Sequence, residues 1–256
     1  MNFALNADQQ MFQKMFADFA AREVSSRAKE IDEAEKLPQD LLNKAGELGF
    51  WAALIPEDLG GAGLDAISYC SMLEEIGKAD ISTAVGLSVH NDLVVQSVVK
   101  HGSEEQQAKY LEPLGTGEMV GAFALTEPAA GSDVAALQMR ATQQNGDFIL
   151  NGCKNWVTNG AIAGLFLVFA RNEGSITAFL VERESPGLKV GYREKTLGLR
   201  GLSFNTLYFD DCHIPVDNRL GKSGDGLAIV KEATDLDRLA LSAISLGGSE
   251  RALAEG

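Results

Sequence analysis

Between residues 121 and 133 the sequence reads Gly121-Ala122-Phe123-Ala124-Leu125-Thr126-Glu127-Pro128-Ala129-Ala130-Gly131-Ser132-Asp133, and its composition changes half-way along. The first residues are apolar and typical of a strand, and the later ones are small or polar residues around a proline. A loop of small residues lets backbone N–H groups approach an anion, and Thr126 and Ser132 add hydroxyl donors. By itself, the stretch also fits an ordinary glycine-bearing turn between strands.

A second stretch, Lys154-Asn155-Trp156-Val157-Thr158-Asn159-Gly160, follows in the same β-rich region. Side chains repeat every two residues along a strand, so Trp156 and Thr158 are predicted to share one face. An indole beside a hydroxyl is suited to covering a flat ring and bonding its edge nitrogen. The alternative for this stretch alone is an aromatic core residue next to a strand threonine.

Short β-rich runs broken by turn residues surround both stretches, from Met119 to about Tyr208. Asn145-Gly146 and Asn151-Gly152 predict hairpin turns on either side of residues 148–150. Apolar runs predict buried strands at 165–170 and 176–181, and further strands are expected at 188–192 and 206–209.

Helical patterns flank this β-rich middle. Asn6 with Gln9, and Ser103 with Gln106, have capping-box spacing, and Pro38 opens a helix that ends near Gly49. Other helices are expected from about residue 65, from residue 82 and after residue 226. The first helix has an apolar stripe of Met11, Phe12, Met15, Phe16 and Phe19.

This order predicts an α+β fold with separate layers. We expect an N-terminal helical domain over 1–117, a β-barrel-like middle domain over 118–225, and the first part of a C-terminal helical bundle over 226–256.

The composition excludes several classes of protein. With 45% hydrophobic residues and a net charge of −14, the chain is typical of soluble globular proteins and lacks the basic stripe that nucleic acid requires. Its three cysteines are widely spaced, and no histidine lies at metal-ligand spacing from a cysteine. We therefore expect neither a metal site nor a disulfide framework. With no leader-like N-terminus and no uncharged run of membrane-span length, we expect a cytoplasmic protein.

Together the two stretches resemble the flavin-facing motifs of the acyl-CoA dehydrogenase family. The resemblance runs from about residue 6 to the end of the sequence, and its other parts are Ile55-Pro56-Glu57 with Gly60-Gly61, residues 101–106, Leu199-Arg200-Gly201 and residues 209–215. It implies FAD as the cofactor. It implies FAD contacts at Phe123, Leu125, Thr126, Gly131, Ser132, Trp156, Val157 and Thr158.

The resemblance also implies a reaction. A carboxylate removes the proton alpha to the thioester of an acyl-CoA, hydride leaves the beta carbon for flavin N5, and hydrogen bonds stabilise the enolate oxygen. The substrate contacts it implies are Ser132, Asp235 and Arg238; for the last two residues, an ion pair on a solvated helix face is the alternative. An electron-transfer flavoprotein as electron acceptor, a dimer or tetramer, and a place in fatty acid or branched-chain amino acid breakdown are also implied.

The resemblance places the family's usual catalytic glutamate beyond Gly256, so we expect this sequence to be part of a longer enzyme. Some branches carry the base on the helix that begins near residue 226, and the matching position here is Asp237, whose side chain is one methylene shorter than glutamate. A helix-terminal Asp favoured by the helix dipole is the alternative.

Other functions stay open. An acyl-CoA oxidase or a flavin monooxygenase of the same fold, and a non-catalytic scaffold, are compatible with the sequence. A nicotinamide-dependent enzyme is disfavoured, because no strand–GxGxxG–helix unit occurs.

Overall fold

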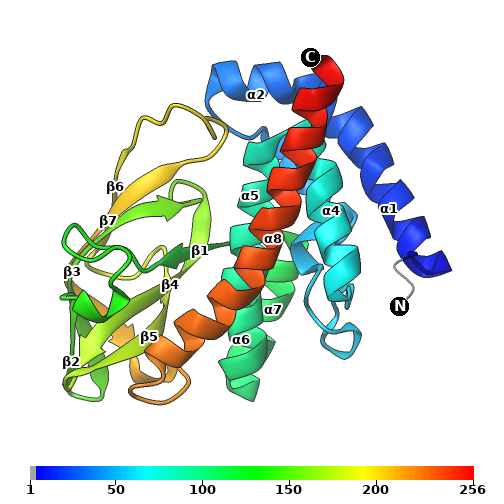
Figure 1. Ribbon diagram of the computed structural model, residues 1–256. Helices are drawn as coiled ribbons and strands as arrows, with labels where there is room; N and C mark the ends of the chain where they lie inside the picture. Colours follow the sequence, from blue (N-terminus) through cyan, green and yellow to red (C-terminus); the bar gives the residue numbers. More distant parts are fainter. Residues whose placement is uncertain (1–3) are drawn as a thin grey trace.

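The computed structural model describes residues 4–256 and places helices and strands in two layers (Figure 1). The α+β class predicted from the sequence is confirmed. The helices are α1 Ala7–Phe19, α2 Ala28–Ala34, α3 Gln39–Glu47, α4 Ala66–Ala79, α5 Ile81–Ser88, α6 Gln96–His101, α7 Glu104–Thr116 and α8 Gly226–Glu255. The strands are β1 Val120–Ala124, β2 Arg140–Gln144, β3 Asp147–Thr158, β4 Ala163–Asn172, β5 Ser175–Glu182, β6 Leu188–Arg193, β7 Phe204–Pro215 and β8 Arg219–Leu220.

Side-chain caps start several of the helices. Asn6 begins α1 and Ser103 begins α7, each within a complete capping box, which confirms both predictions. Asp65 caps α4 and Asp80 caps α5, so α5 starts one residue before the predicted Ser82.

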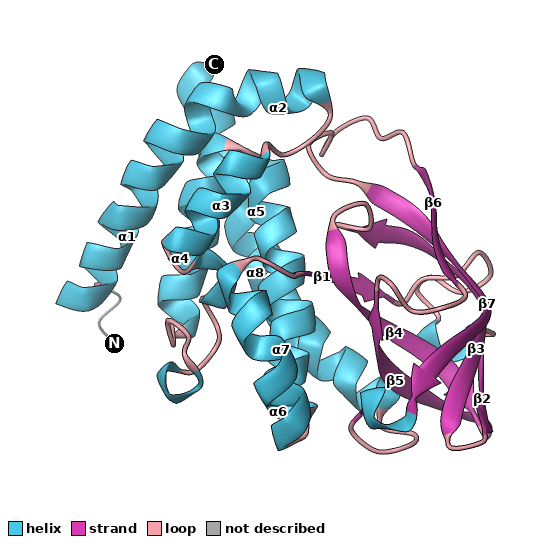
Figure 2. Ribbon diagram, turned by 180° about the vertical axis from the view of Figure 1, so that it is seen from behind, coloured by secondary structure: helices cyan, strands magenta, loops and turns pink. Residues whose placement is uncertain are grey.

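The predicted apolar stripe of α1 is wrong at its two methionines. Phe16 and Phe19 are buried, whereas Met11 is 61% and Met15 37% exposed. The helix packs against α4 and lies at the edge of the helical layer (Figure 2), so only a narrow face of it reaches the core.

The sheet has the strand order β6-β7-β3-β2-β4-β5-β8, and β1 joins it by pairing in parallel with β4. Strand β4 is buried along both faces. Leu165, Leu167 and Phe169 face a cluster shared with the helices, and the alternate residues Phe166 and Val168 face a second cluster made up of strand residues and Met139.

One of the two predicted hairpin turns is correct. Asn145 and Gly146 both have positive φ and join β2 to β3 in a two-residue turn. Asn151-Gly152 is not a turn: it lies inside β3, where the pairing with β7 shifts register between Leu150 and Gly152. The glycine, at φ 144°, lets the bulged strand pass close to Met139, which explains why a turn-like dipeptide stands within a strand.

Helix α8 connects the two layers (Figure 1). At its start, a Cβ on Gly226 would lie 2.7 Å from the carbonyl oxygen of Ile176 in β5, so the helix begins directly against the sheet. Further along it packs on α4, where Gly247 permits close approach to the Glu74 backbone and Lys78 pairs with Glu250.

His90 joins the layers from inside the core. Its Nδ1 accepts the backbone N–H of Gly121 at 2.9 Å, so Nε2 carries the proton and donates to the Trp51 carbonyl at 3.1 Å. The ring is fully buried, and burial lowers the pKa of His90 to about 4. The neutral ring is therefore part of the folded state.

Acid is expected to weaken the fold through this histidine. Unfolding returns the pKa of His90 to its ordinary 6.5. Between pH 6.5 and pH 4 the unfolded chain therefore binds more protons than the folded chain, and the free energy of unfolding decreases as the pH is lowered. From about pH 7.5 to about pH 5 the loss is roughly 2 kcal/mol. Urea unfolding at both pH values should give a loss smaller by about that amount in His90→Gln; equal losses in both proteins would contradict the assignment.

Candidate functional site

The structure brings the two predicted stretches together, although the strands that carry them are not paired. Strand β1 leads into the first stretch and pairs with β4, whereas β3 carries the second and pairs with β2 and β7. The Asn155 N–H donates to the Thr126 carbonyl oxygen at 2.8 Å, and Lys154 Nζ donates to the Leu125 carbonyl oxygen at 2.9 Å.

A buried ion pair completes this junction. Lys154 Nζ lies 2.8 Å from Glu127 Oε1, and neither residue is more than 6% exposed. The Glu127 carboxylate also accepts the backbone N–H groups of Gln138 at 2.6 Å and Met139 at 3.0 Å. Burial lowers the pKa of Lys154 to about 8, and the hydrogen bond that Lys154 donates to Glu127 partly offsets this effect. No role was predicted for either residue, although two opposite charges within small-residue and apolar stretches are a signal of a buried pair.

The tip of the first stretch is a tight turn. Glu127 and Ala130 exchange two backbone hydrogen bonds of 2.9 and 3.1 Å, which leaves Pro128 and Ala129 exposed. The exposed Gly131 and Ser132 follow, and a Cβ added at Gly131 would meet nothing within 4 Å. The backbone after the turn is therefore open to approach from outside.

Trp156 has an unusual backbone. Its φ is +58°, in the left-handed region, and the pairing of β3 with β7 slips between Lys154 and Val157. The indole is 53% exposed, Val157 is fully buried and Thr158 is half-buried. The common face of Trp156 and Thr158 stays a prediction, because the register slip interrupts the regular alternation of the strand. A strained, exposed tryptophan is a feature expected at functional sites.

Several polar side-chain groups of the two stretches have no hydrogen-bond partner. Within residues 4–256, no partner exists for the hydroxyls of Thr126, Ser132 and Thr158, and the buried Asn155 Oδ1 is also unpartnered. Of these residues, Thr126 is tied to the second stretch by its backbone bond to Asn155, and Thr158 lies two residues from the exposed indole. An exposed indole and unpaired hydroxyls are groups that suit a flat ring with a polar edge.

The side chains of Val157 and Phe123, two other predicted flavin contacts, pack against the protein core. The Val157 side chain points into the sheet core, so only its backbone remains for a flavin. Phe123 packs on Phe169 with ring centroids 5.0 Å apart and touches the small cluster of Val89, Leu93 and Ala233.

Comparison with known proteins identifies the family of this chain. Residues 6–118 match the model of the acyl-CoA dehydrogenase N-terminal domain, and residues 122–212 match that of the middle domain. The chain belongs to the acyl-CoA dehydrogenase family.

Relatives within the acyl-CoA dehydrogenase family are longer than this chain. A short-chain specific acyl-CoA dehydrogenase of Clostridium acetobutylicum is 39% identical over the whole chain, which covers 69% of that protein. An acyl-CoA dehydrogenase of Bacillus subtilis is 38% identical over 96% of the chain and 66% of its own length. The chain spans 60% of the human mitochondrial short-chain enzyme.

Solved structures of the family superpose closely. Butyryl-CoA dehydrogenase of Megasphaera elsdenii is 35% identical with a TM-score of 0.95, covering 99% of this chain and 69% of that one. A chain solved in work on the electron transferring flavoprotein of Acidaminococcus fermentans is 40% identical with a TM-score of 0.96, covering 99% and 68%. A glutaryl-CoA dehydrogenase of Mycobacterium smegmatis in complex with FADH2 is 29% identical with a TM-score of 0.93, covering 98% and 64%.

In this acyl-CoA dehydrogenase family member, the predicted substrate residues of α8 face solvent. Arg238 Nη1 lies 2.6 Å from Asp235 Oδ1, and their side chains are 69% and 60% exposed. The described structure records no contact between this pair and Ser132, the other predicted substrate residue, so their common role stays a prediction.

Asp237 occupies a different face of α8. It is half-buried, and burial raises the pKa of its carboxyl, partly offset by Arg238. The nearby Asp92 is fully buried; it accepts the Ser88 hydroxyl at 2.8 Å and the Tyr69 hydroxyl at 3.5 Å, and its Oδ1 has no partner. Burial, followed by the charge of Asp237, raises the pKa of Asp92 well above its usual range. This cluster was not predicted, because its members lie on three elements: Tyr69 on α4, Ser88 on α5 and Asp92 on the π-helical segment Val89–Val95.

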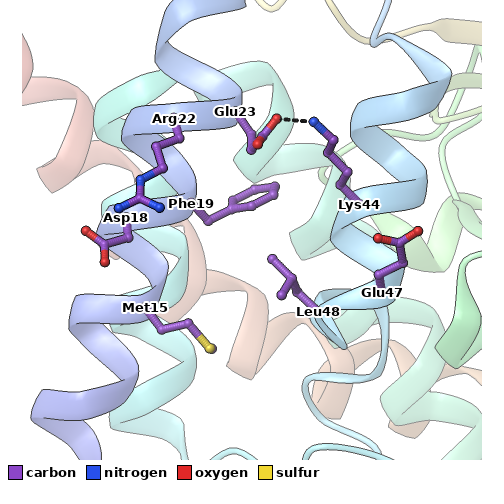
Figure 3. A pocket seen from close by; sticks show the side chains of 8 residues that line it. All are labelled: Met15, Asp18, Phe19, Arg22, Glu23, Lys44, Glu47 and Leu48. Carbon is purple, nitrogen blue, oxygen red and sulfur yellow. Dashed lines mark hydrogen bonds and ion pairs between the residues drawn. The ribbon is translucent and has the colours of Figure 1, made fainter.

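A separate hollow lies in the helical layer between α1 and α3 (Figure 3). Met15, Phe19 and Leu48 line it, and Lys44 pairs with Glu23 at its rim; none of the predicted site residues reaches it. Over residues 4–256, no helix is long and apolar enough to cross a membrane, and no group of three His, Cys, Asp or Glu is placed to hold a metal ion.

Proposed function

We propose that this chain forms the flavin-facing part of an FAD-dependent enzyme that dehydrogenates an acyl-CoA thioester between its alpha and beta carbons. The observation that carries the proposal is the junction of the two stretches, which contain an exposed Trp156 and unpaired hydroxyls. Membership of the acyl-CoA dehydrogenase family and a neighbour solved with FADH2 support it.

The chain's own residues would hold FAD from one side. Trp156 covers the ring, and the Thr158 and Thr126 hydroxyls donate to its polar edge. The open backbone at Gly131, next to the exposed Ser132, accommodates a phosphate, because an exposed N–H group without a side chain beside it admits an anion. FAD supplies the acceptor for hydride.

The acyl-CoA would lie between this face and α8. We assign contact with it to Ser132, Asp235 and Arg238. Within this sequence, Asp237 is the candidate for removal of the alpha proton, because it is half-buried on α8 and burial raises the pKa of its carboxyl. A base outside this sequence is the competing assignment. Butyryl-CoA and short-chain enzymes among the relatives support a short acyl group, and the Acidaminococcus neighbour supports an electron-transfer flavoprotein as acceptor.

Anaerobic addition of butyryl-CoA to the FAD-loaded chain is expected to bleach the flavin absorbance. Bleaching by a nicotinamide nucleotide but not by butyryl-CoA would contradict the proposal. Rapid peroxide formation when oxygen is readmitted would assign the chain to the oxidases, and bound FAD that no acyl-CoA reduces would favour the scaffold.

A further inference from the structure

The buried ion pair of Glu127 and Lys154 connects two segments that the sheet leaves unpaired. Strands β1 and β3 each pair with other strands, so the loop after β1 has no β-ladder to fix it against β3. One backbone hydrogen bond, from Asn155 to Thr126, spans the gap besides the lysine. The position of the loop relative to Trp156 therefore depends on Lys154.

The pair has more hydrogen bonds than an ion pair needs. Lys154 donates both to the carboxylate and to the Leu125 carbonyl oxygen, and the carboxylate receives two further backbone N–H groups from residues 138 and 139. Each bond constrains the direction of a side chain or of the loop backbone. Buried ion pairs add little stability over apolar residues of the same volume, and their best-supported use is to fix one arrangement.

We propose that Glu127 and Lys154 are positioning residues for FAD: they hold the 125–133 loop at the separation from Trp156 and Thr158 that flavin binding requires. The inference rests on the proposed function. Neither residue needs to touch the flavin, since Lys154 is fully buried behind the Leu125 carbonyl.

Such a device makes FAD affinity depend on pH. The pKa of Lys154 is about 8, so alkali removes the proton that holds Glu127 and Leu125 together. The titratable groups that face the ammonium are Glu127 and Cys153. The affinity for FAD should fall above about pH 8, because Lys154 loses its proton there.

The test uses the double variant Glu127→Gln/Lys154→Met, which buries no unpaired charge and keeps an acceptor for one of the two backbone N–H groups. Each of the two single variants leaves one buried charge without its partner, so these variants serve only to show that Glu127 and Lys154 are energetically coupled. Circular dichroism and thermal unfolding establish that the double variant is folded. Its FAD dissociation constant is expected to rise at least 10-fold at neutral pH, and to lose the step near pH 8 that the wild type has. Cys153 is present in both proteins and cancels in the comparison.

Amide hydrogen exchange provides a readout without FAD. In the double variant, residues 125–133 should exchange at least 10-fold faster, while the amides of β4 and β5 keep their protection. A folded double variant that binds FAD within twofold of the wild type, with the same pH profile, would overturn the inference. A wild-type chain that binds no FAD overturns the proposed function as well, whereas normal wild-type binding separates the two outcomes.

Discussion

Replacement of Asp237 by asparagine is expected to slow exchange of the alpha proton of butyryl-CoA at least ~100-fold, since positioned general bases contribute factors of 10² to 10⁴. Asparagine has nearly the same shape but cannot accept the proton. Asp237 is half-buried on α8 beside Asp92 and has a raised pKa, whereas Asp235 on the same helix is exposed and paired with Arg238.

The measurement is wash-in of deuterium from solvent into the thioester, followed by mass spectrometry on the FAD-loaded chain. Glu255→Gln, a change at an exposed position of the same helix, is the matched control and should leave the exchange rate unaltered. Exchange retained in Asp237→Asn, or absent from the wild type, would assign the proton transfer to a base outside this sequence.

Truncation of Trp156 to alanine is expected to weaken FAD binding about 10- to 100-fold, because stacking of a flat base on an aromatic side chain contributes roughly 1–3 kcal/mol. The indole is 53% exposed and makes no ring contact with the described side chains, so its removal costs the fold little. Calorimetric titration with FAD gives the affinity directly.

Trp156→Phe is the matched control, because it keeps an aromatic face at the same backbone position. It should bind FAD within a few-fold of the wild type. A Trp156→Ala variant with unchanged affinity would remove the tryptophan from the proposed flavin site.

Local sequence signals predicted much of the fold. The capping boxes at Asn6 and Ser103 and the turn at Asn145-Gly146 are contained in a few neighbouring residues, and each has the predicted structure. The Asn151-Gly152 dipeptide was misread because the same residues serve a hairpin turn and a bulge. Pairing with the distant β7 decides between them, and a short sequence window does not contain that pairing.

The candidate site likewise has parts that local sequence predicts and parts that depend on contacts between distant residues. The family was predicted from two short stretches and is confirmed, whereas the flavin contacts assigned to their tryptophan and hydroxyls stay predictions. The ion pair of Glu127 and Lys154, and the electrostatic effect of Asp237 on the pKa of Asp92, involve residues from distant parts of the chain. Only tertiary structure reveals such pairs.

The central claim is that the two stretches form one flavin-binding face, and the most direct measurement is an amide and indole ¹H–¹⁵N spectrum during FAD titration. The chain has two tryptophans. The Trp51 indole is buried and donates to the Leu42 carbonyl oxygen at 2.9 Å, so its signal is an internal control. The account predicts saturable shifts of the Trp156 indole and the Thr126 and Thr158 amides at one common affinity, with Trp51 unmoved. Binding of FAD that leaves the Trp156 indole unshifted, or shifts only one of the two stretches, would contradict it.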